Sequence, residues 1–147
     1  MQFVLQWRPW GNSLPVVQRW IEDRGLSNVS VETDRVDNMA AVYQKAHATV
    51  FCVVDPRMCK PVPNSIAESM ACGRPVVVTN RTGLAELVIE HRAGFVIEPD
   101  AEALAVSLDE LADNLQSYGT RARSAAESAF DQSEFVRAYR QIYNEMV

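Results

Sequence analysis

The residues best suited to chemistry lie in one segment, 55–87, where an apolar run leads into a proline-rich loop. A helix is expected to begin near Asn64, since Asn64 and Ser65 both cap helices well, and the fixed φ of Pro61 and Pro63 stiffens the approach. The amino end of a helix offers unpaired N–H groups and the positive end of the dipole, so a phosphate group fits here. The simpler interpretation is that Asn64 only caps the helix.

Short strands and longer helices alternate along the chain and must position this segment. Apolar and β-branched runs predict strands at 2–7, 28–33, 48–54, 74–79 and 94–97. Helical periodicity predicts helices at 13–24, 37–46, 64–72, 83–90, 100–116, 120–130 and 133–146. The alternation predicts an α/β fold: a three-layer, Rossmann-like parallel sheet of about five strands, with helices on both faces and a C-terminal helical tail. We expect residues 1–147 to form one such domain.

Several side chains are expected in the core of this domain. The runs at 48–54 and 75–79 are apolar without alternation, which is typical of strands covered on both faces. Cys52 and Cys72 are expected to act as small buried hydrophobes. An apolar stripe in the last helix predicts core packing, with docking onto a separate domain as the alternative. The stripe is made of Phe135, Tyr139, Ile142 and Met146.

Composition excludes several classes of function. Apolar residues make up 48% and charged residues 22% of the chain, as in an ordinary globular protein. The net charge of −5 gives no basic field, so nucleic acid is not an expected partner. The three cysteines show no metal-ligand spacing with His47 or His91, so neither a metal nor a catalytic cysteine is expected. Neither a secretion signal nor a membrane span is evident, which favours a cytoplasmic location.

The stretch "PNSIAESMACGRPVVVTNRTGLAELV" resembles the donor-binding segment of GT-B glycosyltransferases of the family 4 type, also called group 1 glycosyl transferases. Their pattern is an acidic residue, seven residues, a glutamate, then Ala-Met-Ala-x-Gly-x-Pro-Val-Val and a Gly-x-x-Glu. The matching residues are Glu68, Met70, Ala71, Gly73, Pro75, Val76, Val77, Gly83 and Glu86. Residues 36–56 and 93–111 resemble the flanking segments of the same enzymes, so the likeness covers nearly the whole chain.

The resemblance implies a nucleotide-sugar site that includes Pro63. Glu68 matches the glutamate that binds the ribose hydroxyls, a task that suits a carboxylate because it accepts two hydrogen bonds from a diol. Asn64, Ser65 and Ile66 hold the positions whose backbone N–H groups face the phosphates. No catalytic residue is identified, and neither histidine matches a family position, so structural or surface roles are expected for both.

Lys60 departs from the family pattern. It occupies the position of the first acidic residue, which contacts the transferred sugar in the family. Two interpretations stand side by side: Lys60 acts as a charge clamp on the diphosphate, or the loop has diverged and Lys60 is simply solvated.

The resemblance also implies parts beyond this sequence. Because Arg8 and Pro9 follow it, the strand at 2–7 matches the family's second strand. The first strand, whose loop carries an arginine and a lysine, would then precede Met1. The N-terminal acceptor domain would also be separate, and GT-B enzymes close two domains over their substrates. We therefore expect no sugar transfer by these 147 residues alone, and an unpaired strand edge that leaves homo-oligomerisation open.

The functional expectation is a donor-binding domain of a retaining glycosyltransferase for polysaccharide, lipopolysaccharide or glycolipid synthesis. The resemblance implies a UDP- or GDP-sugar as donor substrate and no cofactor. The expected partner is an N-terminal acceptor domain or a separate subunit, with peripheral membrane association open for the full enzyme. The alternative is a non-catalytic module that binds a nucleotide or sugar phosphate, or serves assembly.

Overall fold

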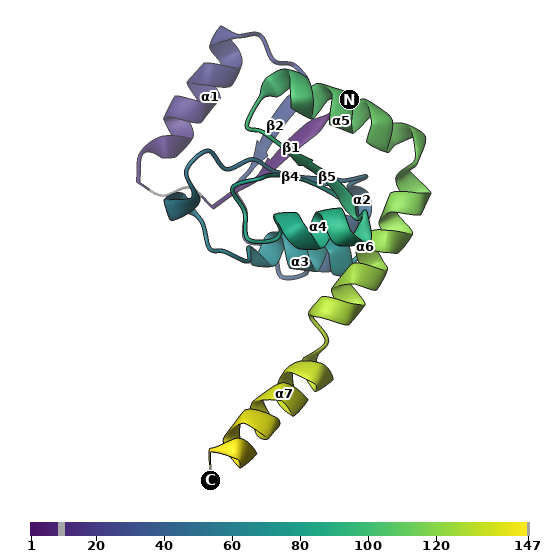
Figure 1. Ribbon diagram of the computed structural model, residues 1–147. Coiled ribbons are helices and arrows are strands. Elements are labelled where there is room, and N and C mark those ends of the chain that lie inside the picture. Colours follow the sequence, from purple (N-terminus) through teal and green to yellow (C-terminus); the bar gives the residue numbers. More distant parts are fainter. Residues whose placement is uncertain (9–10, 147) are drawn as a thin grey trace. The chain divides into compact units, whose positions relative to one another are not determined.

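The computed structural model describes residues 1–8 and 11–146 (Figure 1). Pro9, used above to match the strand at 2–7 to the family's second strand, lies outside the described residues. The chain divides into two compact units, Met1–Asp37 and Asn38–Val147. Each unit holds its own group of parallel strands.

The first unit is a strand, a helix and a second strand. Strands β1 (Phe3–Gln6) and β2 (Val29–Glu32) pair in parallel, with Phe3 opposite Val29. Helix α1 (Ser13–Asp23) connects them and buries none of its side chains completely. Among the described residues, β1 has a strand partner on one side only, which is β2. Its apolar side chains stay accessible: Val4 is 59% exposed.

The second unit contains three parallel strands in the order β3-β4-β5. The strands are β3 (Thr49–Phe51), β4 (Val76–Thr79) and β5 (Gly94–Ile97). The helices are α2 (Met39–Lys45), the 3-10 turn η1 (Pro56–Met58), α3 (Asn64–Ala71), α4 (Ala85–His91), α5 (Ala101–Asp113), α6 (Leu115–Ala129) and α7 (Gln132–Glu145). In Figure 1, α3 and α4 lie on one face of these strands and α5 lies on the other.

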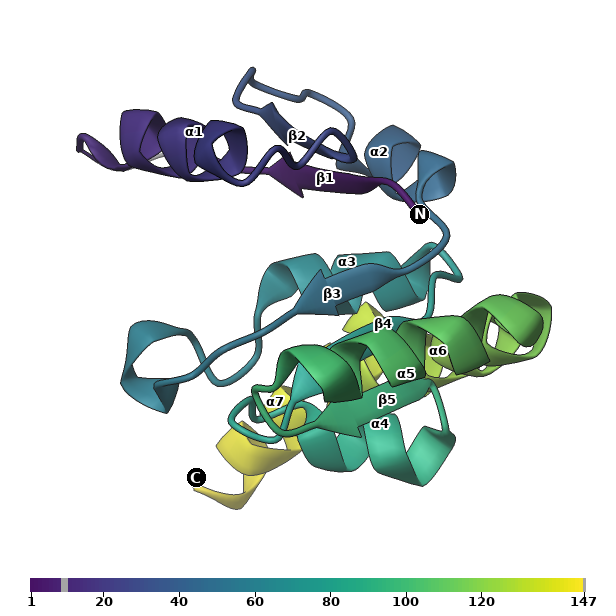
Figure 2. The same ribbon diagram turned by 90° about the horizontal axis from the view of Figure 1, so that it is seen from above.

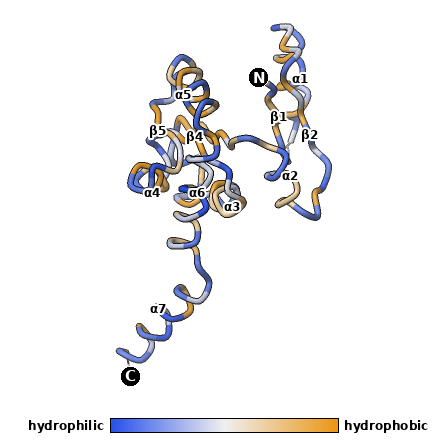
Figure 3. The backbone as a smooth tube through the Cα atoms, turned by 90° about the vertical axis from the view of Figure 1, so that its right-hand side faces the viewer, coloured by the Kyte–Doolittle hydropathy of each residue, from blue (hydrophilic) through white to orange (hydrophobic). Residues whose placement is uncertain are grey.

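The core of the second unit is built around β4. Val76, Val77 and Val78 are fully buried, as a strand covered on both faces requires. Ile66 and Met70 of α3 pack against this strand. Burying one such side chain contributes about 1.5–3 kcal/mol of transfer free energy, so these residues fix α3 on the sheet. In Figure 3 the hydrophobic colouring runs along β4 and β5.

Close backbone approach fixes α6 beside the turn after α3. A methyl group built on Gly119 would lie 2.6 Å from the carbonyl oxygen of Gly73, which only glycine permits. Gly73 itself has φ +70° and ends α3 in the left-handed conformation. Ala122 and Ala125, both fully buried, continue the same contact surface of α6.

The expected alternation of strands and helices is confirmed among the described residues, with parallel strands and helices on both faces. The five strands of the described residues are hydrogen-bonded in two groups, of two and three strands. The last three helices also occur, but α6 begins at Leu115, so the break predicted at 117–119 is wrong and those residues are helical.

The prediction for 48–54 is wrong in extent and in burial. The strand ends at Phe51, and its three residues are only half-buried. Within the described chain, β3 has a strand partner on one side alone. Beyond it, the buried hydroxyl of Thr79 donates to the carbonyl oxygen of Val53 at 2.8 Å and accepts from the Val53 N–H at 3.0 Å. At Val53 these two bonds to a side chain take the place of backbone hydrogen bonds between strands. Cys52 is exposed, contrary to prediction, and Cys72 is half-buried.

The prediction that the stripe of α7 packs in the core is also wrong. No side chain of α7 is buried, and Phe135, Tyr139, Ile142 and Met146 are all at least half exposed. The aromatic rings of Phe135 and Tyr139 contact each other, with centroids 4.6 Å apart. Across the described chain, no helix is both long and apolar enough to cross a bilayer.

Candidate functional site

The candidate site lies where α3 begins, after the loop that leaves β3 (Figure 2). Buried Pro63 stands at the N-cap position with φ −70° and ψ 123°, and no side chain caps the helix. The prediction that Asn64 or Ser65 caps α3 is therefore wrong, because both already have places within the helix. Proline fits this position because its ring fixes the φ at which the chain enters the first turn.

Two backbone N–H groups remain open at this end of the helix. The carbonyl oxygen of Pro63 accepts from the N–H of Ile66 at 3.1 Å and from that of Ala67 at 3.4 Å. Within the described residues, the N–H groups of Asn64 and Ser65 have no acceptor. Ile66 thus contributes a fully buried side chain that anchors the helix, while its N–H group is already occupied. The geometry leaves two donors at the positive end of the α3 dipole.

Glu68 lies one helical turn after Asn64, so the two share a face of α3. Its side chain is exposed. Its Oε2 atom accepts a hydrogen bond from the hydroxyl of Tyr43 in α2 at 3.1 Å. Tyr43 is only 6% exposed. The carboxylate is therefore accessible from solvent and tied to a buried donor from a second helix.

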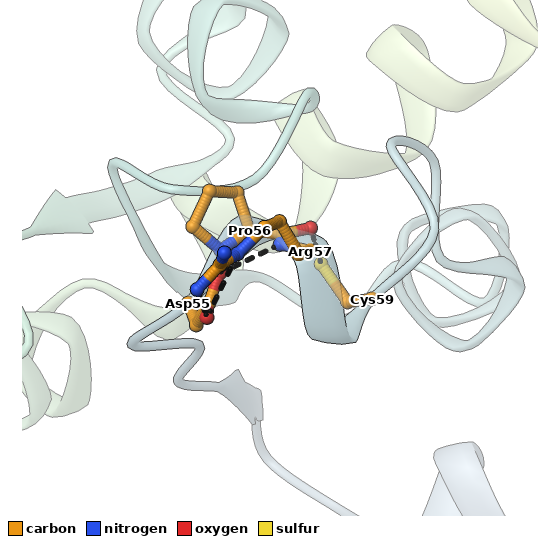
Figure 4. Close-up of polar contacts among 4 residues, drawn as sticks. All are labelled: Asp55, Pro56, Arg57 and Cys59. Carbon is orange, nitrogen blue, oxygen red and sulfur yellow. Dashed lines mark hydrogen bonds and ion pairs between the residues drawn. The ribbon is translucent and has the colours of Figure 1, made fainter.

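The loop before α3 is stabilised by its own contacts (Figure 4). The side chain of Asp55 accepts from the backbone N–H of Arg57 at 3.0 Å and pairs with its guanidinium, with 2.7 Å between Oδ2 and Nη2. These hydrogen bonds hold the pKa of the Asp55 carboxyl below its usual range. The thiol of Cys59 lies 3.9 Å from the carbonyl oxygen of Pro56. The Asp55 carboxylate thus binds Arg57 and stabilises the loop.

Lys60 follows this turn and is exposed. It has no hydrogen-bond or ion-pair partner within residues 1–8 and 11–146. The acidic residue nearest to it on the loop, Asp55, binds Arg57 instead. The ammonium group of Lys60 is therefore available to bind an anion.

A second loop, between β4 and α4, packs against the first. A methyl group built on Gly83 would lie 2.6 Å from the carbonyl oxygen of Pro61. Thr82 is 5% exposed, and both its backbone N–H and its hydroxyl donate to the carbonyl oxygen of Thr79. The carboxyl ends of β3 and β4 thus carry two loops in contact, at the edge where parallel sheets bind ligands.

The two histidines lie away from this edge. His91 is the last residue of α4. His47 lines a hollow of about 630 Å³ together with Arg74, Pro75 and residues of α6. This hollow lies at the amino end of β4, whereas α3 begins beside the carboxyl ends of the strands, so we base the candidate site on α3. No three His, Cys, Asp or Glu side chains in the described chain gather as metal ligands would.

Comparison with known proteins assigns the family. The sequence profile of the family "Glycosyl transferases group 1" matches residues 9–114. The chain belongs to the group 1 glycosyltransferases. The fold of this glycosyltransferase domain agrees: it matches a GT-B structure, sucrose-phosphate synthase from Thermosynechococcus elongatus, with a TM-score of 0.80 and 24% identity, over 99% of this chain and 38% of that one.

Two curated relatives show how far the likeness extends. A putative colanic acid biosynthesis glycosyltransferase of Salmonella typhimurium is 40% identical over 81 residues, which is 52% of this chain and 20% of the relative. A D-inositol 3-phosphate glycosyltransferase of Paenarthrobacter aurescens is 31% identical over 114 residues, which is 77% of this chain and 28% of the relative. The glycosyltransferase domain thus matches less than a third of the length of each of these relatives.

Tyr43 is not among the residues that the sequence predicts for the site. It lies 25 residues before Glu68 and on a different helix. Its segment, 36–56, resembles the family, but nothing in the sequence pairs a tyrosine of α2 with a glutamate of α3. The contact depends on how α2 packs against α3.

Proposed function

We propose that this domain binds the nucleotide diphosphate sugar donor of a retaining glycosyltransferase. The observation that carries the proposal is the amino end of α3, where two open N–H groups share a helix with the accessible carboxylate of Glu68. We propose that the whole protein acts on the cytoplasmic side, on precursors of polysaccharide, lipopolysaccharide or glycolipid. A relative named for colanic acid biosynthesis supports that substrate class.

The chemistry of the site suits a nucleoside diphosphate. The N–H groups of Asn64 and Ser65 and the positive end of the α3 dipole favour the negative charge of a phosphate. Glu68 offers acceptor oxygens to the two ribose hydroxyls. Stabilising the departing diphosphate lowers the barrier to sugar transfer, because charge develops on this group in the transition state.

Calorimetry with a panel of nucleotides and nucleotide sugars tests the proposal. UDP or GDP should bind, and Glu68→Ala should weaken binding by about 1–3 kcal/mol, the usual cost of removing a charged hydrogen-bonding partner. Glu110→Ala is the matched control, because Glu110 is an exposed carboxylate on α5. Equal affinities for Glu68→Ala and the wild type would refute the assignment of Glu68.

The exposed cation Lys60 favours a second candidate, a binding module without turnover, because the family pattern has an acidic residue there. Incubation of the full-length protein with radiolabelled nucleotide sugars and a membrane-derived acceptor extract distinguishes a transferase from a binding module. Labelling of acceptor above a Glu68→Ala control would establish transfer, whereas nucleotide binding by the full-length protein without labelling would favour the module.

A further inference from the structure

The hydroxyl of buried Tyr43 donates a hydrogen bond to Glu68, the carboxylate that we propose binds the ribose. The Tyr43 hydroxyl lies 3.1 Å from Oε2 of Glu68, and the two residues come from packed helices, α2 and α3. Their surroundings differ, since Tyr43 is 6% exposed and Glu68 is exposed. A buried aromatic ring has one fixed position, whereas an exposed glutamate side chain samples several rotamers. The phenol is therefore the fixed partner of the pair.

The direction of the hydrogen bond is set as well. Burial of the ring, and then the negative charge of Glu68, raise the pKa of the Tyr43 phenol above its ordinary value. The phenol keeps its proton throughout the neutral range and acts as the donor. The other carboxylate oxygen, Oε1, has no partner in the described chain.

We propose that Tyr43 is a positioning residue for nucleotide recognition. Its hydroxyl selects the rotamer in which Glu68 presents its remaining acceptor sites to the ribose hydroxyls of a nucleoside diphosphate. The inference rests on the proposed function, because it gives Glu68 a ribose to bind. Holding the carboxylate in advance reduces the rotamer entropy that ligand binding must otherwise remove.

A purely structural role is the competing account, in which the hydrogen bond only joins α2 to α3. The two accounts differ in what they predict for ligands. Loss of a structural tie would weaken every ligand of the domain alike. Loss of a positioning contact should matter only to a ligand whose ribose carries the hydroxyls that Glu68 accepts.

The test is calorimetric titration of Tyr43→Phe with UDP and GDP and with their 2′,3′-dideoxy analogues. Phenylalanine keeps the ring and removes only the hydroxyl. We expect about 2- to 10-fold weaker binding of the ribose nucleotides, the range for loss of one hydrogen bond, and unchanged binding of the dideoxy analogues. Tyr118→Phe is the control, since the Tyr118 ring contacts Phe95 while its hydroxyl has no partner in the described residues.

Two further measurements complete the design. Tyr43→Phe should add no loss to a Glu68→Ala background, because the hydroxyl acts through that carboxylate. Side-chain carbon relaxation should show a more mobile Glu68 in Tyr43→Phe without any ligand. Equal weakening of both nucleotide types, an unchanged ribose affinity or an unchanged Glu68 side chain would each overturn the inference. A wild-type protein that binds no nucleotide would instead refute the proposed function.

Discussion

At Lys60 a positive charge stands where the family pattern has an acid, and the structure bears on what it does. The side chain is exposed, and Asp55 is paired with Arg57 rather than with Lys60. An unpaired ammonium group on the loop that leads into α3 is suited to an anionic ligand. An exposed, unpaired ammonium group fits both interpretations, and of the two we propose the charge clamp.

Replacing Lys60 by methionine tests this preference. Lys60→Met should weaken UDP or GDP binding about 2- to 5-fold, as expected for an exposed ion pair worth up to about 1 kcal/mol, and leave uridine or guanosine binding unchanged. The difference should shrink as salt is raised, because exposed charges are screened. A series of calorimetric titrations at increasing salt measures both effects. Identical affinities for Lys60→Met and the wild type would assign Lys60 to solvent.

At the scale of elements, the site depends on two loops that touch through backbone atoms. The close approach of Gly83 to the carbonyl oxygen of Pro61 links the loop after β4 to the loop after β3. Any side chain at position 83 must displace backbone, which yields less easily than the end of a flexible side chain. The loop before α3 should therefore respond to a change made 22 positions after Pro61.

Gly83→Ala should destabilise the protein by about 1–3 kcal/mol, the usual cost of overpacking, and weaken nucleotide binding by shifting the loop before α3. Urea unfolding and calorimetry measure the two effects. Arg81→Ala is the matched control in the same loop. Within the described residues, the Arg81 side chain makes only an exposed ion pair with Glu98, at 3.7 Å, and its loss should cost about 0.5 kcal/mol or less. If both variants behave alike, the backbone contact does not support the loop.

Sequence periodicity predicts the elements well because it reports burial, and burial decides where helices and strands form. The start of α3 shows where this reasoning fails. Asn64 has the side chain of a capping residue, yet it is the first residue of α3, and the N-cap position belongs to Pro63. Helix ends depend on backbone geometry, which composition does not determine. The extent of β3 was missed for a related reason, since the Thr79 side chain takes over the backbone groups of Val53.

The candidate site itself was predictable only in part. Glu68 and the amino end of α3 lie within one contiguous motif, so sequence resemblance points to both. Tyr43 is brought to Glu68 by tertiary packing, and the bond between Ile66 N–H and Pro63 is a local backbone detail. Neither of these two contacts can be predicted from hydrophobic periodicity or from the motif.

For the whole molecule, the most conspicuous feature is an amphipathic helix without buried side chains. The apolar stripe of α7 is exposed, while the core of the second unit is formed by β4 with α3, α4 and α6. The contribution of α7 to the stability of the unit should therefore be small. Its periodicity is that of a core helix, and we propose that the stripe docks onto a separate domain.

Unfolding measurements test this separation of α7 from the core. The double change Phe135→Ser and Ile142→Ser should alter the free energy of unfolding by about 1 kcal/mol or less, because both side chains are more than half exposed. Met70→Ala should cost about 2–5 kcal/mol, because Met70 is fully buried. A large loss in the α7 variant would show that its stripe is packed in solution.

Nuclear magnetic resonance can show whether a nucleoside diphosphate binds at the amino end of α3. The amide signals of ¹⁵N-labelled protein are followed during titration with UDP and with GDP. The largest shifts should belong to Asn64 and Ser65, whose N–H groups are open, with smaller changes at Ile66, whose N–H group is bonded to Pro63. Saturating shifts centred on the hollow that contains His47 and Arg74, with none at the start of α3, would contradict this prediction.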